Sequence, residues 1–307
     1  MMPFRSTVVG TLVVALLSAL CMVGCASSHD EAPAALSPRL LTDVAPLTTA
    51  DRQRPTVALV LGGGGLRGFA HLGVLRALEE AGIQPDIIVG SSAGAVVGAA
   101  YASGLSAAQI EAIAGDLKPS SLIDLTFSTS GLMRGDHIAS WINTLTAGAA
   151  IEAFPLRFAA VATDLSSGNA VLLDKGSPGR AVQASAAVPG VNVPVAYPGG
   201  HLVDGGVSSL IPVRAARAMG ADVVIAVDIY CHGPGSDVLG APAILLRVMR
   251  VQSCLVAKSE IAEADVLIAP AVRVPGMSAN EERQAAVAAG YAAAGAALER
   301  IRLRLAA

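Results

Sequence analysis

The sequence predicts an α/β domain whose central sheet is largely parallel and is covered by helices on both faces. Short aliphatic runs alternate with longer helical stretches, and glycines stand at several junctions between them. Hydrophobic residues make up 53% of the chain and charged residues only 15%. Aliphatic strands separated by helices are typical of a parallel sheet that is buried on both faces. We find no internal repeat and no second domain boundary, so one domain is expected over residues 56–305.

The domain is expected to contain six strands and five helices. The strands are short runs rich in aliphatic residues, at 56–61, 87–89, 157–163, 170–173, 222–229 and 265–269. Helices are expected at 69–81, from 94 to about 103, and at 136–145, 213–219 and 280–305, and all but the one at 213–219 begin at a glycine turn or a polar residue.

The amino terminus is typical of a secretory signal. Arg5 precedes the apolar run Val8–Leu20, which is too short and wrongly flanked for a membrane span. Met22–Cys25 resembles the lipobox of bacterial lipoproteins, although Leu is usual at the position of Met22. This resemblance implies a signal peptide over residues 1–24 and acylation of Cys25, with palmitate among the chains. The protein would then be anchored in the bacterial cell envelope, at the outer membrane or its periplasmic face. An ordinary signal peptide, with Cys25 incidental, is the alternative.

Residues 25–55 are rich in Ala, Ser, Pro and Thr and show no helical or strand period, so a flexible tether is expected there. The two remaining cysteines of the exported chain, Cys231 and Cys254, either form a disulfide or stay as two buried thiols. No cluster of cysteine and histidine suggests a metal site, and no cofactor is expected. The net charge of −3 leaves no basic excess for a phosphate backbone, which argues against nucleic-acid binding.

The first glycine turn, Gly63–Gly68, has the spacing G-x-G-x-x-G between a strand and a helix. Converging backbone N–H groups and the helix dipole can hold a phosphate or a transient oxyanion. A dinucleotide site also needs an acidic residue at the end of the next strand. That strand ends in Gly90 and Ser91 instead, so a nucleotide-binding protein is the weaker alternative.

The second glycine turn, Gly90–Gly94, has the pattern G-x-S-x-G between a strand and a helix, where a nucleophile elbow belongs. Its small residues let the helix approach the strand and force Ser92 into a strained turn. The Ser92 hydroxyl would then lie at a helix amino terminus, which favours developing negative charge. Ser92 is therefore the expected nucleophile, with a simple helix cap as the alternative.

The base that would activate Ser92 has two candidates in the sequence. Of His29, His71, His137, His201 and His232, only His232 comes well after a plausible acid, which would allow a Ser-Asp-His triad. Asp204 is the other candidate, because Gly205 and Gly206 follow it and leave its carboxylate on an open turn. A carboxylate with a raised pKa can take a serine proton directly. The Asp-Gly pair is also a common turn, and these residues alone leave the alternatives open.

The three motifs together resemble the patatin-like phospholipase family. Gly-Gly-Gly-x-Arg-Gly, Gly-x-Ser-x-Gly and Asp-Gly-Gly occur in that order, and the connecting stretches 70–75, 160–165 and 221–228 agree with it. The resemblance extends over nearly the whole domain and is closest to the bacterial branch related to neuropathy target esterase. It implies a three-layer α/β/α sandwich with a mostly parallel central sheet.

The resemblance also implies a catalytic dyad, with Ser92 as nucleophile and Asp204 as proton acceptor. The N–H groups of Gly63, Gly64 and Gly65 would form an oxyanion hole, and Arg67 would support that loop. The remaining motif residues would hold the turns: Gly68, Gly90, Gly94, Gly205 and Gly206. The implied activity is a serine acyl hydrolase that cleaves phospholipid or lysophospholipid esters through an acyl-enzyme. The partners would be this lipid and, through the anchor, a membrane surface.

Some positions depart from the family pattern or have other uses. Gln183 stands where the family has arginine, and Asn192 where it has an aromatic residue. Both are expected near the pocket wall, so these departures bear on substrate preference more than on the dyad. His71 is expected to be a packed helical histidine, and Leu117–Arg134 is a candidate lid. An acyltransferase of the same fold and a non-catalytic envelope lipoprotein remain alternatives. The oligomeric state is not predicted.

Overall fold

A computed structural model of the chain describes residues 35–46, 54–116, 119–126, 128–234, 240–273 and 280–306. The expected signal peptide, Cys25, His29 and parts of the expected tether and lid lie outside the described residues.

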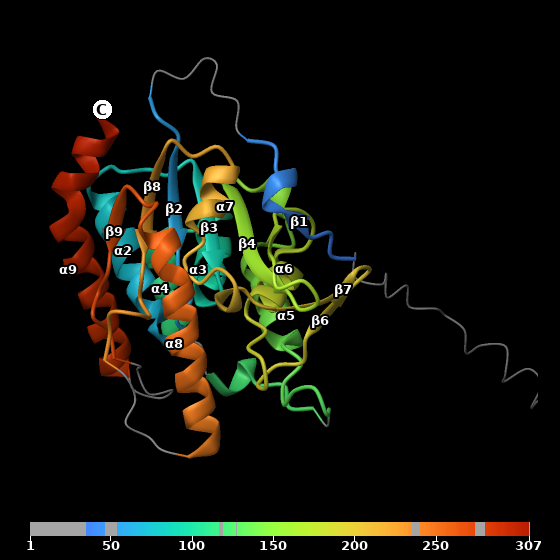
Figure 1. The fold of residues 1–307 in the computed structure, drawn as a ribbon. Helices are drawn as coiled ribbons and strands as arrows, with labels where there is room; N and C mark the ends of the chain where they lie inside the picture. The colour runs from blue at the N-terminus through green and yellow to red at the C-terminus, as the bar shows by residue number, and fades with distance from the viewer. Residues whose placement is uncertain are drawn as a thin grey trace, which may run out of the picture. The chain divides into compact units, whose positions relative to one another are not determined.

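One nine-stranded sheet forms the centre of the domain (Figure 1). Along its main path the strand order is β1-β5-β4-β3-β2-β8-β9, and the hairpin β6-β7 joins it through β4. The five strands β4, β3, β2, β8 and β9 run parallel to one another, while β1, β5, β6 and β7 form antiparallel pairs. The strands are β1 (Arg39–Leu40), β2 (Val57–Leu61), β3 (Ile87–Ser91), β4 (Arg157–Asp164), β5 (Ala170–Leu173), β6 (Val195–Tyr197), β7 (Gly200–Asp204), β8 (Val223–Val227) and β9 (Val266–Ile268).

Helices cover both faces of this sheet. The α-helices are α2 (Phe69–Glu80), α3 (Ala93–Ala102), α4 (Ala107–Asp116), α5 (Asp136–Leu145), α6 (Pro178–Ser185), α7 (Val213–Ala218), α8 (Ala241–Ile261) and α9 (Asn280–Leu305). Short 3-10 turns lie between them: η1 (Leu41–Asp43), η2 (Gly65–Gly68), η3 (Pro119–Leu122), η4 (Ile151–Ala153) and η5 (Gly205–Val207).

The alternation of side chains along β2 explains the two cores. Leu59 and Leu61 point to one face, where they pack with residues of α2, α3 and α9. Ala58 and Val60 point to the other face and pack with residues of α7. All five β2 residues are buried, as a strand covered on both faces requires. The predicted three-layer α/β/α fold with a mostly parallel sheet is thereby confirmed.

Part of the segment expected to be a flexible tether is docked on the sheet instead. Strand β1 pairs antiparallel with β5, and Arg39 forms an ion pair with Asp174. Leu36 and Val44 on either side are buried. The sequence does not predict this contact, because two buried apolar residues and a strand of two residues are too few to produce a recognisable periodicity of hydrophobic residues.

Four further elements were not predicted from the sequence: the hairpin β6-β7 and helices α4, α6 and α8. Helix α6 begins with Pro178 and Gly179, which usually interrupt helices, but Ser177 caps it and Pro is favoured in a first turn. The hairpin strands are only 3 and 5 residues long. In α8 the apolar residues are largely exposed, so they do not follow the pattern of a core-facing helix.

Cys231 and Cys254 form a disulfide, with 5.6 Å between their Cα atoms. Of the two alternatives that the sequence leaves open, the structure therefore has the disulfide. The bond ties the loop after β8 to the middle of α8.

Candidate active site

Ser92 occupies the turn between β3 and α3, where the sequence places a nucleophile elbow. Its φ of 51° and ψ of −120° are unusual for a residue with a side chain, and such backbone strain is concentrated at functional sites. The residue is 9% exposed, so the hydroxyl is largely withdrawn from water.

The glycines around Ser92 allow a close approach of helix and strand. A Cβ atom on Gly90 would lie 2.4 Å from the carbonyl oxygen of Gly94. A Cβ atom on Gly94 would lie 1.9 Å from the carbonyl oxygen of Leu61. Any larger residue would thus push α3 away from β2 and β3 and open the turn that holds Ser92.

Ser185, at the end of α6, fixes the backbone of the elbow. Its hydroxyl accepts a hydrogen bond from the Ser92 N–H at 2.9 Å and donates one to the Val161 carbonyl at 2.6 Å. Ser185 is completely buried. The strained turn is therefore tied to β4 by a side chain that the sequence does not single out for this role.

Strand β4 brings Ser92 and Asp204 together. Its first part pairs with β3, and its last part pairs with β7 along the same edge. Ser91 lies opposite Val161, and Asp204 lies opposite the next residue, Ala162. Because β3 and β7 approach this point from opposite directions, their ends meet. The Ser92 Oγ donates a hydrogen bond to the Asp204 Oδ2 at 2.6 Å.

The surroundings of Asp204 favour its protonated form more than water does. Burial raises the pKa of this carboxyl to about 6, against the opposing effect of hydrogen bonds from the Ser92 hydroxyl and the Gly206 N–H. The Gly206 N–H donates to Oδ1 at 2.7 Å, within the short turn η5 that also contains Gly205. A carboxylate with a pKa near 6 is largely ionised at neutral pH and is still a better base than an ordinary aspartate.

The glycine loop differs in one respect from the expected oxyanion hole. The N–H of Gly63 donates to the Leu210 carbonyl at 3.0 Å, so it is not free to bind an oxyanion. Across the described residues, the N–H groups of Gly64 and Gly65 donate to no backbone carbonyl. Both glycines line the same cavity as Ser92, whereas Gly68 is buried at the start of α2. The expectation of three donors is thus corrected to two.

Arg67 is a buried arginine with no carboxylate partner in the described chain. Its guanidinium donates to the carbonyls of Val272 and Pro234 and lies 5.2 Å from the centre of the Tyr230 ring. Arg250 lies over the same ring at 5.3 Å. Burial, followed by the nearby charge of Arg250, lowers the pKa of Arg67. The side chain therefore joins the glycine loop to the segments around residues 230–234 and 272, and it adds positive charge to the cavity.

None of the four described histidines lines the cavities at Ser92. His71 is fully buried on α2, as expected, and its Nε2 lies 2.8 Å from the Gly62 carbonyl. Burial lowers the pKa of His71 to about 4. His232 pairs instead with Asp228, at 2.6 Å, so the triad that the sequence allows is not formed.

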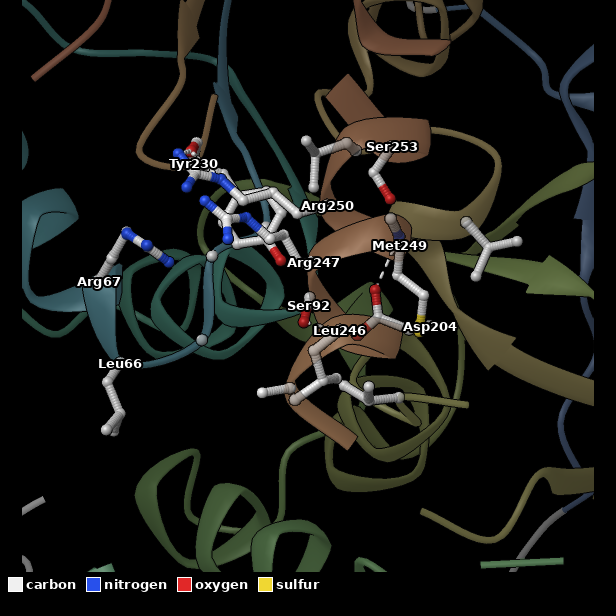
Figure 2. Close-up of a pocket in the computed structure, with 18 residues that line it drawn as sticks. Leu66, Arg67, Ser92, Asp204, Tyr230, Leu246, Arg247, Met249, Arg250 and Ser253 are labelled. Atoms are coloured by element: carbon white, nitrogen blue, oxygen red, sulfur yellow. Dashed lines mark hydrogen bonds between the residues drawn. The ribbon is translucent and has the colours of Figure 1, made fainter. Parts of the chain in front are cut away.

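Two cavities meet at Ser92. One has a volume of about 370 Å³ and contains the residues labelled in Figure 2, where Ser92 lies between Arg67 and Asp204. The other, of about 290 Å³, lies toward α3 and α5 and is lined mostly by apolar side chains, including Leu72, Val96, Ile138 and Trp141. Ser92 therefore faces a space with charged walls and a space with apolar walls. The described residues contain no group of three or more acidic, histidine or cysteine side chains that could hold a metal ion.

Comparison with known proteins agrees with this geometry. The model of the family "Patatin-like phospholipase" matches residues 59–217, more than half of the chain, and this range includes Ser92 and Asp204. The chain belongs to the patatin-like phospholipase family. The resemblance on which the sequence analysis relied is thereby confirmed.

Relatives within the family come from bacteria and animals. An NTE family protein of Mycobacterium tuberculosis is 38% identical over 191 residues, which is 60% of this chain and 52% of that protein. Patatin-like phospholipase domain-containing protein 6 of Homo sapiens is 38% identical over 184 residues, 57% of this chain and 13% of that protein. The chain thus spans about half of the mycobacterial relative and a small part of the human one. The predicted relation to the neuropathy target esterase branch is confirmed.

Among solved structures, VipD from Legionella pneumophila has a similar fold. The TM-score is 0.57 at 16% sequence identity, over 86% of this chain and 70% of that one. At this level of identity the likeness supports the fold alone.

The two departures from the patatin-like pattern lie away from the cavity walls, contrary to expectation. Gln183 donates to the Arg134 carbonyl and to Asp136, and accepts from Arg180, so it holds the start of α5. Neither Gln183 nor Asn192 lines either cavity at Ser92.

Helix α8 contributes a wall of the first cavity that sequence analysis missed. The contributing residues are Ala243, Leu246, Arg247, Met249, Arg250 and Ser253. Arg247 is exposed and makes no hydrogen bond or ion pair within the part of the chain that the structure describes. The signal available in the sequence was the pair of Cys231 and Cys254. A disulfide between them places α8 next to the loop after β8, and the end of β8 lies beside the end of β2, where the glycine loop begins.

Proposed function

We propose that the protein is a serine acyl hydrolase that cleaves carboxylic esters of phospholipids or lysophospholipids through a Ser92–Asp204 dyad. The hydrogen bond of 2.6 Å between Ser92 Oγ and Asp204 Oδ2 carries the proposal. It lies at a strained elbow and at the meeting point of two cavities, beside the N–H groups of Gly64 and Gly65, which donate to no backbone carbonyl of the described residues. Family membership supports a lipid hydrolase as the class of activity.

The first half of the reaction follows from this geometry. Asp204 takes the hydroxyl proton while Ser92 Oγ attacks the ester carbonyl carbon. The carbonyl oxygen becomes an oxyanion that the N–H groups of Gly64 and Gly65 can accept, and each such donor is typically worth about 3 kcal/mol of barrier. Protonated Asp204 then gives its proton to the leaving alcohol, and the acyl group stays on Ser92.

Water completes the cycle. Asp204 accepts a proton from water as its oxygen attacks the acyl-enzyme, a second oxyanion forms at the same two N–H groups, and Ser92 leaves with the proton from Asp204. The product is a free fatty acid. An acyltransferase would use an alcohol in place of this water.

The two cavities support a phospholipid as substrate. An ester at Ser92 can extend its acyl chain into the apolar cavity lined by Leu72, Val96 and Trp141. The remainder of the lipid would occupy the other cavity, whose walls contain Arg67, Arg247 and Arg250 and only one carboxylate, Asp204. Guanidinium groups are well suited to phosphate oxygens.

The test is hydrolysis of p-nitrophenyl esters and of phosphatidylglycerol by the wild type, Ser92→Ala and Asp204→Asn. We expect each substitution to lower kcat/KM by about a thousandfold or more while the fold is retained. Ser91→Ala is the matched control, because Ser91 is buried next to Ser92 but its hydroxyl has no hydrogen-bond partner among the described residues. This variant should keep its activity.

Each outcome is decisive. Activity that survives Ser92→Ala would rule out the mechanism. Transfer of the acyl group to added glycerol, without release of fatty acid, would replace the hydrolase by an acyltransferase.

We also propose that the protein is exported and anchored in the bacterial envelope through acylated Cys25. The apolar run before Cys25 supports export, and the Cys231–Cys254 disulfide suits an oxidising compartment. Metabolic labelling with palmitate tests this directly. The wild type should incorporate the label and Cys25→Ser should not, whereas equal labelling of both would contradict the anchor.

A further inference from the structure

Helix α8 carries an apolar surface that the fold leaves exposed. Of the fifteen large hydrophobic side chains that are exposed in the described chain, seven belong to this helix. Four of them, spaced at four, three and four residues, lie along one line of the helix surface: Ile244, Val248, Val251 and Leu255. Their exposed fractions lie between 47% and 58%. Leu245 and Val256 lie next to these four residues, on one side of the line. We call these six residues the α8 stripe.

The opposite side of α8 faces the domain. Ala257 and Glu260 are buried, and Glu260 accepts hydrogen bonds from the Ser209 hydroxyl and the Arg214 N–H. Arg250 donates to the Tyr230 and Gly233 carbonyls, and Cys254 is held by its disulfide. The helix is thus fixed by polar and covalent links and turns its apolar stripe outward, the reverse of an ordinary surface helix.

The charges of α8 indicate what covers the stripe. Between Ala241 and Ser259 the helix contains Arg247, Arg250 and Lys258 and no acidic residue. A helix with an apolar stripe and accompanying cations is typical of segments that lie in the headgroup region of an anionic bilayer. No helix among the described residues has the length and apolar character needed to cross a membrane.

The stripe is also continuous with the candidate active site. Leu246, Arg247 and Met249 of the same helix line the cavity at Ser92, next to Ile244 and Val248 of the stripe. Leu125 and Leu132 form a second exposed apolar group. They lie in the segment that follows Leu122, and Leu122 itself lines the apolar cavity. Figure 1 shows α8 and this segment (green) both reaching the lower end of the domain in the view.

We infer that the α8 stripe is a lipid-docking surface that seats the domain on an anionic bilayer with the Ser92 cavities toward the lipid. The inference rests on the proposed function for its substrate. It assigns to α8 a role that neither the dyad nor the amino-terminal anchor supplies, because the anchor attaches the chain to a membrane without orienting the domain.

Fluorescence quenching tests this contact independently of the anchor. Trp141 is the single tryptophan of the chain, so Val251→Trp in a Trp141→Phe, Ser92→Ala background gives one reporter on a protein that cannot hydrolyse the lipid. Vesicles of phosphatidylcholine and phosphatidylglycerol with brominated acyl chains serve as probe and quencher. We expect Val251→Trp to lose about half of its emission or more. Leu303→Trp on α9, at a position that is 66% exposed against 55% for Val251, should keep its emission in the same vesicles.

A second variant measures what the contact does for activity. Ile244→Gln, Val248→Gln, Val251→Gln and Leu255→Gln together should lower hydrolysis of vesicle phosphatidylglycerol about tenfold or more. Hydrolysis of soluble p-nitrophenyl butyrate should stay within about twofold, because none of the four lines the cavities. The matched control changes two exposed leucines elsewhere, Leu165→Gln with Leu303→Gln, and should leave both activities unchanged.

The outcomes separate this inference from the proposed function. Absence of quenching in Val251→Trp, or equal quenching in Leu303→Trp, overturns the docking surface even if ester hydrolysis depends on Ser92. A wild type that dimerises in sedimentation, and that the four glutamines make monomeric without any quenching by lipid, would make the stripe a self-association surface instead. Quenching without ester hydrolysis in the wild type would support docking and refute the hydrolase.

Discussion

At the scale of single residues, the proposed chemistry depends on the burial of Asp204. The fully buried carboxyl has a pKa raised to about 6, so it must lose its proton before it can act as a base. We therefore expect kcat/KM to rise with pH through about 6 and to level off above pH 7. The pH profile of p-nitrophenyl butyrate hydrolysis measures this directly. An acid limb near pH 4, the range of an ordinary aspartate, would contradict the assigned environment.

The same pKa predicts how stability changes with pH. Because the pKa of Asp204 is higher in the folded than in the unfolded chain, its stabilising effect is present below about pH 4 and is lost as pH rises through 6. A shift of about two pKa units corresponds to about 3 kcal/mol. Relative to the wild type, Asp204→Asn should gain stability between pH 4 and pH 8, by up to that amount. Urea unfolding at both pH values tests this, and a constant difference between the two proteins would refute it.

Ser185 is the residue through which the elbow is held. Replacing it by alanine removes the acceptor of the Ser92 N–H and the donor to the Val161 carbonyl, both buried. Such unsatisfied groups cost about 1 to 3 kcal/mol. We expect Ser185→Ala to lower kcat about tenfold with little change in KM, since the elbow loses its orientation while the cavities stay intact. Steady-state kinetics separate the two parameters.

A second serine of α6 provides the control for this prediction. Ser177 caps the same helix and contacts neither Ser92 nor β4. Ser177→Ala should lower stability by about 1 kcal/mol and leave kcat unchanged. If both variants lowered kcat equally, Ser185 would act only through the stability of α6.

At the scale of elements, the site is assembled where three strands meet. β3 and β7 share one edge of β4, so a change of register in β7 by one residue would turn Asp204 away from Ser92. The dyad therefore depends on strand pairing across more than 100 residues of sequence.

The elements that the sequence predicts and those it misses differ in where their apolar residues point. β2, β3, β4 and β8 are aliphatic because both faces of the sheet are buried, and their bounds agree with the prediction to within two residues. The elbow at Ser92 was predictable for a similar reason, since its glycines are required by close packing. The use of the Gly63 N–H by Leu210 and the support from Ser185 depend on long-range contacts that leave no local pattern.

Helix α8 gives a prediction at this scale through its disulfide. The bond joins residues 23 positions apart, and closing a loop of this size is worth about 3 kcal/mol in the chain-entropy model. Replacing Cys231 and Cys254 by alanine should lower stability by about this amount and expose α8 to faster hydrogen exchange. Exchange in α2 should be unaffected when measured well below the unfolding midpoint. Equal acceleration in both helices would mean that the bond stabilises the whole domain and does not hold α8 in particular.

At the scale of the whole molecule, the proposed dyad lies at the boundary between two chemically different spaces. Toward α3 and α5 the walls are apolar, and toward α8 they carry three arginines. A two-part ligand with an acyl chain and an anionic group fits this division better than a neutral ester does. The proposed dyad of Ser92 and Asp204 is compatible with any ester, so a preference for a lipid would have to come from the elements around these two residues.

Arg247 allows this division to be tested in solution. It is exposed in the cavity wall and has no ion-pair partner among the described residues, so its guanidinium is free to meet a phosphate. We expect Arg247→Gln to raise KM for a short-chain, monomeric phosphatidylglycerol about fivefold, equivalent to about 1 kcal/mol, with kcat unchanged. KM for p-nitrophenyl butyrate should not change, because that ester carries no anion. Lys258→Gln, on the same helix but outside the cavity, should leave both values unaltered. If Arg247→Gln raised KM for both substrates alike, the arginine would shape the cavity without recognising charge, and the polar half of the lipid would be bound by Arg67 and Arg250 alone.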